Sequence, residues 1–279
     1  MSEGQRIPYH SSPLPVHGAR GVLVAAPHPD DEVFGCGGCA ALYAGAGVPV
    51  RSLILTDGGL GGVQEGVDDL VATRYQEVIC AAALLGYGTP IFAGHPDRSL
   101  QDSIAAVAEL MVEEMRATGA DVLFAPSLWE MHPDHIAAAQ AALLAIKQLG
   151  DGYTLVQYEV GVPLLPNRLV DITPVQTQKR QAMQCFVSQL AVQAYDRHIS
   201  SLNIFRTYTL SPGIEAAEAV RVATAAEADK DPFGLVFEGN VHPVHRHLAL
   251  PPITLLAPPL APTKRWFSRW LTPRLKKQV

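Results

Sequence analysis

Charged side chains are scarce in this sequence. Asp, Glu, Lys and Arg make up 17% of its 279 residues, and the formal net charge is -6. Proteins that bind nucleic acid usually present a basic face, so this balance argues against that class. No segment reaches the roughly 18 consecutive apolar residues that span a bilayer, and residues 1–20 lack the apolar run of a signal peptide. We therefore expect a cytoplasmic protein without a nucleic-acid partner.

Cysteine is also sparse, with only Cys36, Cys39, Cys80 and Cys185. A chain of this length does not depend on a disulfide scaffold, and three of the four lie in apolar contexts typical of a core. We expect reduced thiols in a reducing compartment. Cys36-Gly-Gly-Cys39 has no second CxxC partner, so we interpret it as small core residues at the start of a helix. A redox brake on a neighbouring metal is the alternative.

Hydrophobic residues are plentiful, at 48%, which is enough for a substantial core. Short apolar runs predict strands at 21–26, 50–56, 90–93, 121–125 and 153–158. Helical spacing predicts helices at 36–47, 70–85, 104–118, 135–149 and 174–190. This alternation predicts an α/β fold: a Rossmann-like, mostly parallel sheet with helices on both faces, plus a C-terminal extension. Such sheets bind ligands at the carboxyl ends of their strands.

The end of the chain differs in composition from the rest. Residues 240–279 contain seven Lys or Arg and no acidic residue. We predict one domain over residues 1–240 and a Pro-rich basic tail over 241–279. Trp and Phe mix with basic residues in 264–277, which suits peripheral contact with the inner face of a membrane; packing on the domain or on a partner subunit is the alternative. His242, His245 and His247 are interpreted as solvated rather than as a second metal site.

Two polar clusters follow predicted strands. Residues 27–32 read Pro-His-Pro-Asp-Asp-Glu, and residues 132–135 read His-Pro-Asp-His. Each alone suits a turn or a helix cap, but buried carboxylates are costly unless they are paired or bind metal. At one edge of a parallel sheet, His28, Asp31 and His135 could form a His₂-carboxylate site with an open position. Asp30 and His132 would then remain beside it as acid/base groups.

These motifs resemble the PIG-L/LmbE-like deacetylases, which act on N-acetylglucosaminyl conjugates. The resemblance covers about residues 20–220. Its core is Ala26-Pro27-His28-Pro29-Asp30-Asp31-Glu32 with His132-Pro133-Asp134-His135. Supporting pieces are Leu55-Thr56-Asp57-Gly58, Arg74-Tyr75-Gln76-Glu77, Pro96-Asp97, and Lys179 with Ser188-Gln189.

The resemblance implies a role for each matching residue. It makes His28, Asp31 and His135 the Zn²⁺ ligands, Asp30 the general base, and His132 a charged or proton-donating partner of the tetrahedral intermediate. It also places Arg74 and Asp97 at the sugar hydroxyls and Glu32 behind the ligands. The sequence departs from some relatives at Glu130, where they carry a tyrosine that aids the oxyanion. A His₂-carboxylate set also accepts Fe²⁺ or Co²⁺.

We therefore expect a zinc-dependent hydrolase that removes the acetyl group from an N-acetylglucosamine-type sugar or conjugate, either small or lipid-linked. Two alternatives stay open: an amidase acting on another N-acyl conjugate, and a non-catalytic zinc- or sugar-binding module. A homo-oligomer is compatible with the sequence. The glycines between 58 and 66 match no phosphate-binding pattern, and we interpret them as a rim loop over the pocket.

Overall fold

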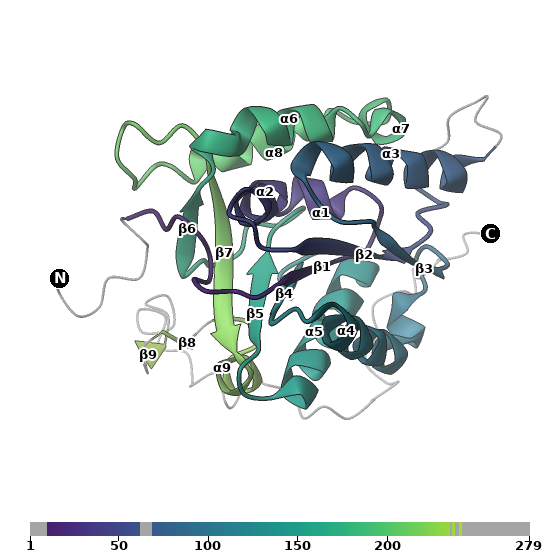
Figure 1. Cartoon of the computed structure of the whole chain (residues 1–279), viewed down its shortest axis with the longest axis horizontal. Helices are drawn as coiled ribbons and strands as arrows, with labels where there is room; N and C mark the ends of the chain where they lie inside the picture. The colour runs from purple at the N-terminus through teal and green to yellow at the C-terminus, as the bar shows by residue number, and fades with distance from the viewer. Residues whose placement is uncertain (1–9, 62–68, 235, 238–239, 242–279) are drawn as a thin grey trace, which may run out of the picture. The chain divides into compact units, whose positions relative to one another are not determined.

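A seven-stranded mixed sheet forms the centre of the computed structural model, which describes residues 10–61, 69–234, 236–237 and 240–241 (Figure 1). The strands run in the order β3-β2-β1-β4-β5-β7-β6. Their bounds are β1 Val22–Ala26, β2 Val50–Thr56, β3 Ile91–His95, β4 Val122–Pro126, β5 Thr154–Tyr158, β6 Arg168–Asp171 and β7 Ala217–Thr224. Strands β1 to β5 are parallel, and β7 pairs antiparallel with both β5 and β6. The predicted mostly parallel α/β fold is confirmed.

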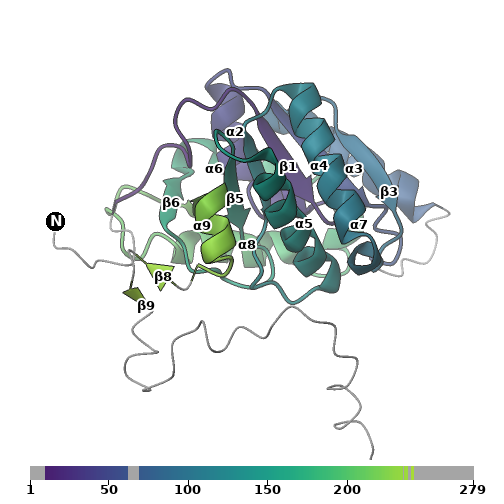
Figure 2. The same ribbon diagram turned by 90° about the horizontal axis from the view of Figure 1, so that it is seen from below.

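Helices cover both faces of the sheet, as Figure 1 shows. The reason lies in strand β1, which is buried on both sides. Val22 and Val24 join one core cluster, whereas Leu23 and Ala25 join the other. The first cluster is covered mainly by α1 (Asp31–Phe34), α2 (Gly37–Gly45), α3 (Leu70–Leu85), α6 (Gln176–Met183), α7 (Val187–Leu190) and α8 (Tyr195–Phe205). The second is covered by α4 (Ile104–Thr118), α5 (Pro133–Leu149) and α9 (Ala225–Lys230), which lie together in Figure 2.

The strand order creates a switch point between β1 and β4. From β1 the chain moves outward through β2 and β3, then returns to add β4 on the other side of β1. The two strands pair in parallel, with Val24 opposite Phe124, so their carboxyl ends lie side by side. Open α/β sheets bind ligands at this position. Both polar clusters of the sequence emerge here.

The second half of the chain departs from the predicted elements. The expected helix over 174–190 is interrupted, because α6 ends at Met183 and α7 begins at Val187. Strands β6 and β7 and helix α8 were not predicted. Strand β7 is rich in alanine, which favours helix in isolation, and its strand form depends on pairing with β5 and β6.

The end of the chain is a separate unit. Residues 236–237 and 240–241 form a short antiparallel pair, β8 (Val236–Phe237) with β9 (Asn240–Val241). The predicted basic tail, its three histidines and segment 264–277 otherwise lie outside the described residues. Among the helices that the structure describes, none combines the length and apolar character needed to cross a membrane.

The cysteines divide into two kinds. Cys36 and Cys39 are fully buried free thiols at the start of α2, as interpreted. Burial raises the pKa of both thiols well above the ordinary value, which disfavours the reactive thiolate of a redox brake. The expectation of reduced thiols is wrong for Cys80 and Cys185, which form a disulfide between α3 and the α6–α7 junction. Spacing could not predict this pair, since the two cysteines are 105 residues apart.

A buried ion pair fixes the bend between α1 and α2. Lys179 Nζ lies 2.7 Å from Glu218 Oε1 and also donates to the Phe34 carbonyl, at the end of α1. The two Glu218 oxygens accept from the Gly38 and Cys39 amides, each at 2.7 Å, at the start of α2. A Cβ on Gly38 would approach Glu218 Oε1 to 2.8 Å, so glycine is required there. The pair therefore positions the segment that begins with Asp31.

We predict that removing either partner of this pair destabilises the fold. Lys179→Met or Glu218→Gln should lower the free energy of unfolding by about 3–5 kcal/mol, because the remaining charge is buried without compensation. The double variant should lose less than the sum. Urea unfolding followed by circular dichroism measures this. Lys147→Met is the control, since Lys147 pairs with Asp229 on the exposed surface and should cost under about 1 kcal/mol. A single-variant loss no larger than this control would contradict the prediction.

Candidate metal centre and active site

Three nitrogen and oxygen atoms converge at the carboxyl ends of β1 and β4. His28 Nδ1 lies 3.2 Å from Asp31 Oδ2 and 3.2 Å from His135 Nε2. His135 Nε2 lies 3.1 Å from Asp31 Oδ2. These atoms form a nearly equilateral triangle. His28 follows β1, Asp31 opens α1, and His135 lies in the first turn of α5. The structure thus brings the three predicted ligands together.

The triangle has the dimensions of one face of a metal coordination shell. Neighbouring ligands of a tetrahedral Zn²⁺ with bonds of about 2.0–2.1 Å are roughly 3.3 Å apart. Two ring nitrogens facing each other also need a proton or a cation between them. Although burial opposes charge on the ring, Asp31 raises the pKa of His135 to about 9. Burial likewise opposes ionisation of Asp31, but His135 and His28 hold its pKa well below the ordinary value. The pocket therefore favours positive charge at its centre.

The carboxylates around the triangle also favour a cation at its centre. Five carboxylates here are buried residues, and the side chain of a sixth, Asp97, is 6% exposed. The six are Asp30, Asp31, Glu32, Asp97, Glu130 and Asp134. Within the described ranges, Arg74 is the one permanent cation that pairs directly with any of them. Carboxylates at this density are stable only when protonated or neutralised by a cation, so these residues fit a divalent metal.

Two further carboxylates face the other side of the His28 ring. Asp134 Oδ2 lies 3.2 Å and Asp97 Oδ1 lies 3.4 Å from His28 Nε2. Asp134 also accepts from the Arg98 and Leu100 amides, at 2.6 and 3.1 Å, so it is firmly held. A proton on Nε2 leaves the Nδ1 lone pair for a metal. We therefore interpret Asp97 and Asp134 as groups that orient His28.

Other metal-compatible sets share His28. One combines His28 with His132 and His135, and another combines it with Asp97, His132 and Asp134; ligand atoms in each lie within 4.8 Å of one another. In the set with Asp31, the three ligand atoms lie 3.1–3.2 Å apart. Among the described backbone amides, that of His28 is the one that donates to a ligand atom of this set, Asp31 Oδ2. The Asp31 set remains the predicted metal site, and the other two sets are alternatives that share His28.

Asp30 lies beside the triangle in a constrained conformation. Its φ of 145° is in a region that residues other than glycine rarely adopt. Two contacts hold it: its amide donates to Glu32 Oε2 at 3.0 Å, and its Oδ2 accepts from Arg74 Nη2 at 3.1 Å. Burial raises the pKa of Asp30 to about 7, and Arg74 opposes that rise. Burial also raises the pKa of Glu32 to about 8, with the Asp30 carboxylate adding to it.

Arg74 is enclosed by the protein and has 2% of its surface exposed. Its guanidinium donates to the carbonyls of Gly58 and Pro29 as well as to Asp30. A Cβ at Gly58 would approach Arg74 Nη1 to 2.5 Å, and one at Gly61 would collide with the same atom. Gly58 and Gly61 thus lie against the guanidinium. In this structure Arg74 positions Asp30, and its predicted contact with a sugar is untested.

His132 is the N-cap of α5 and is partly exposed. Its Nδ1 accepts from the Asp134 amide at 3.2 Å, which places the proton of the neutral ring on Nε2. Its ring meets that of His28 edge-on, with centroids 4.6 Å apart. Burial, followed by the charges of His28 and His135, lowers the pKa of His132. The geometry favours a neutral imidazole that can donate a hydrogen bond from Nε2.

Glu130 proves to be a buried residue of the site. Its Oε2 lies 3.4 Å from His135 Nδ1, and its oxygens accept from the backbone amides of 160–162. Asp134 was likewise missed as a contact of His28. The sequence held a clue to both, since a carboxylate within or beside a histidine motif at a strand end needs a partner once it is buried.

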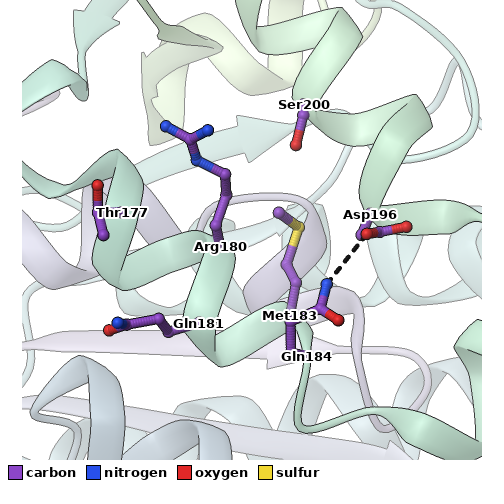
Figure 3. A pocket seen from close by; sticks show the side chains of 7 residues that line it. All are labelled: Thr177, Arg180, Gln181, Met183, Gln184, Asp196 and Ser200. Carbon is purple, nitrogen blue, oxygen red and sulfur yellow. Dashed lines mark hydrogen bonds between the residues drawn. The ribbon is translucent and has the colours of Figure 1, made fainter.

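A separate cleft of about 360 Å³ lies between α6 and α8 (Figure 3). Gln184 bridges it by donating to Asp196 at 3.0 Å. Its lining residues are Thr177, Arg180, Gln181, Met183, Gln184, Asp196 and Ser200. None of them belongs to the cluster around His28, and the one carboxylate among them, Asp196, accepts a hydrogen bond from Gln184. The chemistry of the described residues is therefore concentrated at the β1/β4 edge.

Comparison with known proteins agrees with this geometry. The PIG-L family model, described as GlcNAc-PI de-N-acetylase, matches residues 23–146. A probable N-acetyl-alpha-D-glucosaminyl L-malate deacetylase 2 of Bacillus anthracis is 27% identical over 193 residues, which are 62% of this chain and 83% of that protein. The N,N'-diacetylchitobiose deacetylase from Pyrococcus horikoshii, solved with its inhibitor, superposes with a TM-score of 0.67. It is 26% identical, over 75% of this chain and 85% of the other.

A third relative shares the fold alone. GalB, the 4-carboxy-2-hydroxymuconate hydratase of Pseudomonas putida KT2440, superposes with a TM-score of 0.59 at 22% identity, over 73% of this chain and 96% of the other.

The family model spans β1 through most of α5, so it includes His28, Asp31 and His135 and both polar motifs. Residues 23–146 of the chain are thus a PIG-L family domain, and the relatives that the chain resembles are named deacetylases.

Proposed function

We propose that this protein is a metal-dependent deacetylase that hydrolyses the acetamide of an N-acetylglucosamine-type sugar or conjugate, releasing acetate and a free amine. The observation that carries the proposal is the triangle of His28, Asp31 and His135 with Asp30 held beside it. The relatives support the substrate class, since the Bacillus anthracis protein is described as a glucosaminyl-malate deacetylase and the Pyrococcus horikoshii enzyme as a diacetylchitobiose deacetylase.

Zn²⁺ is the proposed metal, held by His28, Asp31 and His135. Two imidazoles and a carboxylate with an open position are typical of catalytic zinc, although Fe²⁺ and Co²⁺ accept the same ligands. When bound, such a metal polarises a carbonyl and makes a water molecule more acidic. The residues around it supply orientation, since Asp97 and Asp134 fix the His28 ring.

Asp30 is the proposed general base. Its carboxylate takes a proton from the attacking water as the water oxygen bonds to the acetamide carbon. Arg74 holds one of its oxygens and Glu32 holds its backbone amide, so the base is fixed before substrate binds. A base whose pKa is raised towards neutrality by burial accepts a proton and releases it again readily.

His132 is proposed to act on the developing tetrahedral centre. Its Nε2–H would donate to the negative oxygen or supply the proton that the departing nitrogen needs when the C–N bond breaks. The hydrogen bond from the Asp134 amide keeps Nδ1 an acceptor, which favours the first of these roles. Proton balance is then met if Asp30 passes the proton of the water to the amine.

Other N-acyl conjugates are the main alternative substrates, because the reacting groups would be the same. The shared fold of a hydratase underlines that chemistry follows the site rather than the fold. A non-catalytic binding role would not require a strained, buried Asp30. Lipid-linked sugars, membrane contact through 264–277, a homo-oligomer and a cytoplasmic setting all stay predictions.

The reaction class can be tested by measuring acetate and free amine released from a panel of N-acetylglucosamine conjugates. Native protein, chelator-treated protein and chelator-treated protein given Zn²⁺ should be compared on simple, lipid-linked and thiol-bearing members. Metal-restored release is expected on at least one member. A folded, zinc-loaded protein that releases nothing from any member would contradict the proposal.

A second prediction compares His135, a proposed metal ligand, with His132, which lies three residues away and is not a proposed ligand. His135→Ala should weaken zinc binding by more than about 100-fold, because a ligand costs more than its supporting partners do. His132→Ala should keep wild-type zinc binding. Metal content after dialysis and the zinc-induced shift in melting temperature measure both. Equal zinc loss in the two variants would favour the His28, His132 and His135 set instead.

A third prediction concerns the general base. Asp30→Asn should lower kcat by about 10²–10⁴-fold, since the amide cannot accept the proton. Zinc content should not change, because Asp30 is not a ligand. Steady-state kinetics and metal analysis on the same preparation separate the two effects. Retention of wild-type kcat would rule out Asp30 as the base, and loss of zinc would place it among the ligands.

A further inference from the structure

We propose that Glu130 positions His135 for metal binding by accepting the hydrogen bond of its Nδ1. This proposal rests on the metal centre of the proposed function. Glu130 occupies the position where some relatives carry a tyrosine that aids the oxyanion. Here the side chain faces the ligand His135 from behind, with Oε2 3.4 Å from Nδ1.

The Glu130 carboxylate is built into the protein. The side chain is 1% exposed, and it joins the loop after β4 to the loop after β5. Oε1 accepts from the amides of Val160 at 2.8 Å and Gly161 at 3.1 Å, and Oε2 is also 3.1 Å from the Gly161 amide. A Cβ on Gly161 would lie 3.1 Å from Oε2, so a glycine allows this close approach. These amides fix the carboxylate in space.

The chemistry of imidazole explains why His135 needs this partner. When Nε2 offers its lone pair to a metal, the proton of the neutral ring is on Nδ1. That buried N–H then requires an acceptor. His135 Nδ1 forms no hydrogen bond with the described residues, and Glu130 Oε2, 3.4 Å away, is the carboxylate oxygen that faces it. A small rotation of the ring would align the N–H with this oxygen for a hydrogen bond.

A carboxylate at this position has a different role from a tyrosine hydroxyl. It makes the His135 nitrogen more basic and so strengthens the ligand. An anion cannot donate a hydrogen bond to an oxyanion, so Glu130 does not replace the tyrosine hydroxyl. Stabilisation of that charge falls to the metal and to His132 Nε2–H.

The chain provides a matched control in Glu159. This residue is as buried as Glu130, with 4% of its surface exposed, and it anchors the other end of the same loop. Its Oε2 accepts from the Leu164 amide at 2.8 Å, and its Oε1 accepts from Arg206 at 2.8 Å. It has no contact with a metal ligand among those described. We expect its substitution by glutamine to loosen the loop and to leave the contact between Glu130 and His135 in place.

The experiment compares zinc affinity in Glu130→Gln and Glu159→Gln by competition with a chelator. A glutamine has one acceptor oxygen and cannot serve both the loop amides and His135. We expect Glu130→Gln to weaken zinc binding by about 10–100-fold and Glu159→Gln to stay within about twofold of wild type. Glu130→Asp keeps the negative charge but places it farther from His135 Nδ1, because the side chain is shorter. This variant should weaken zinc binding too. The visible spectrum of Co²⁺-loaded protein should change in the Glu130 variants alone.

Metal affinity is independent of the substrate, so this test does not depend on deacetylase activity. Equal zinc affinity and unchanged Co²⁺ spectra in the Glu130 and Glu159 variants would overturn the proposal and leave Glu130 as a loop anchor. Thermal unfolding of the metal-free variants checks that both are folded. Wild-type protein that binds zinc but releases no acetate would contradict the proposed function and leave the role of Glu130 intact.

Discussion

The Asp31 carboxylate meeting His28 and His135 is the contact on which the site depends. Three ligand atoms 3.1–3.2 Å apart are stable only with positive charge among them. His28 and Asp31 lie in the segment that follows β1, whereas His135 lies in α5 after β4, so the sheet must hold β1 beside β4 before the three can meet. The buried Lys179–Glu218 pair fixes the bend between the end of α1 and the start of α2. Fold and metal centre are therefore linked through a few polar contacts.

Much of this arrangement could be predicted from the sequence because it follows from local pattern. The five parallel strands are short apolar runs bounded by turns, and one polar motif comes directly after β1 while the other follows β4 after a short loop. Parallel strands end at one edge, which suffices to bring 27–32 and 132–135 together. What local pattern could not reveal depends on distant partners. Strand β7 requires β5 and β6, and the disulfide joins residues 105 positions apart.

The roles of the polar residues were harder to predict than their location. Arg74 was expected at the sugar hydroxyls by resemblance, which stays a prediction, and the structure adds that Gly58 and Gly61 lie against its guanidinium, which donates to Asp30. Gly58 and Gly61, interpreted from the sequence as part of a rim loop, lie against this guanidinium, because a side chain at either position would collide with it. A motif predicts which charged residues belong to a site. The packing around such a residue decides whether its side chain faces the ligand or another residue of the protein.

Glu130 shows how one substitution within a shared framework can shift the chemistry of a site. A tyrosine hydroxyl donates a hydrogen bond towards the reaction, whereas a carboxylate accepts one from a ligand behind it. The backbone amides of the loop after β5 make the second arrangement stable, because they solvate the buried anion. In the proposed mechanism, the charge of the tetrahedral intermediate would then be stabilised by the bound metal and by His132. The proposed hydrogen bond from His135 to Glu130 would strengthen a ligand of that metal.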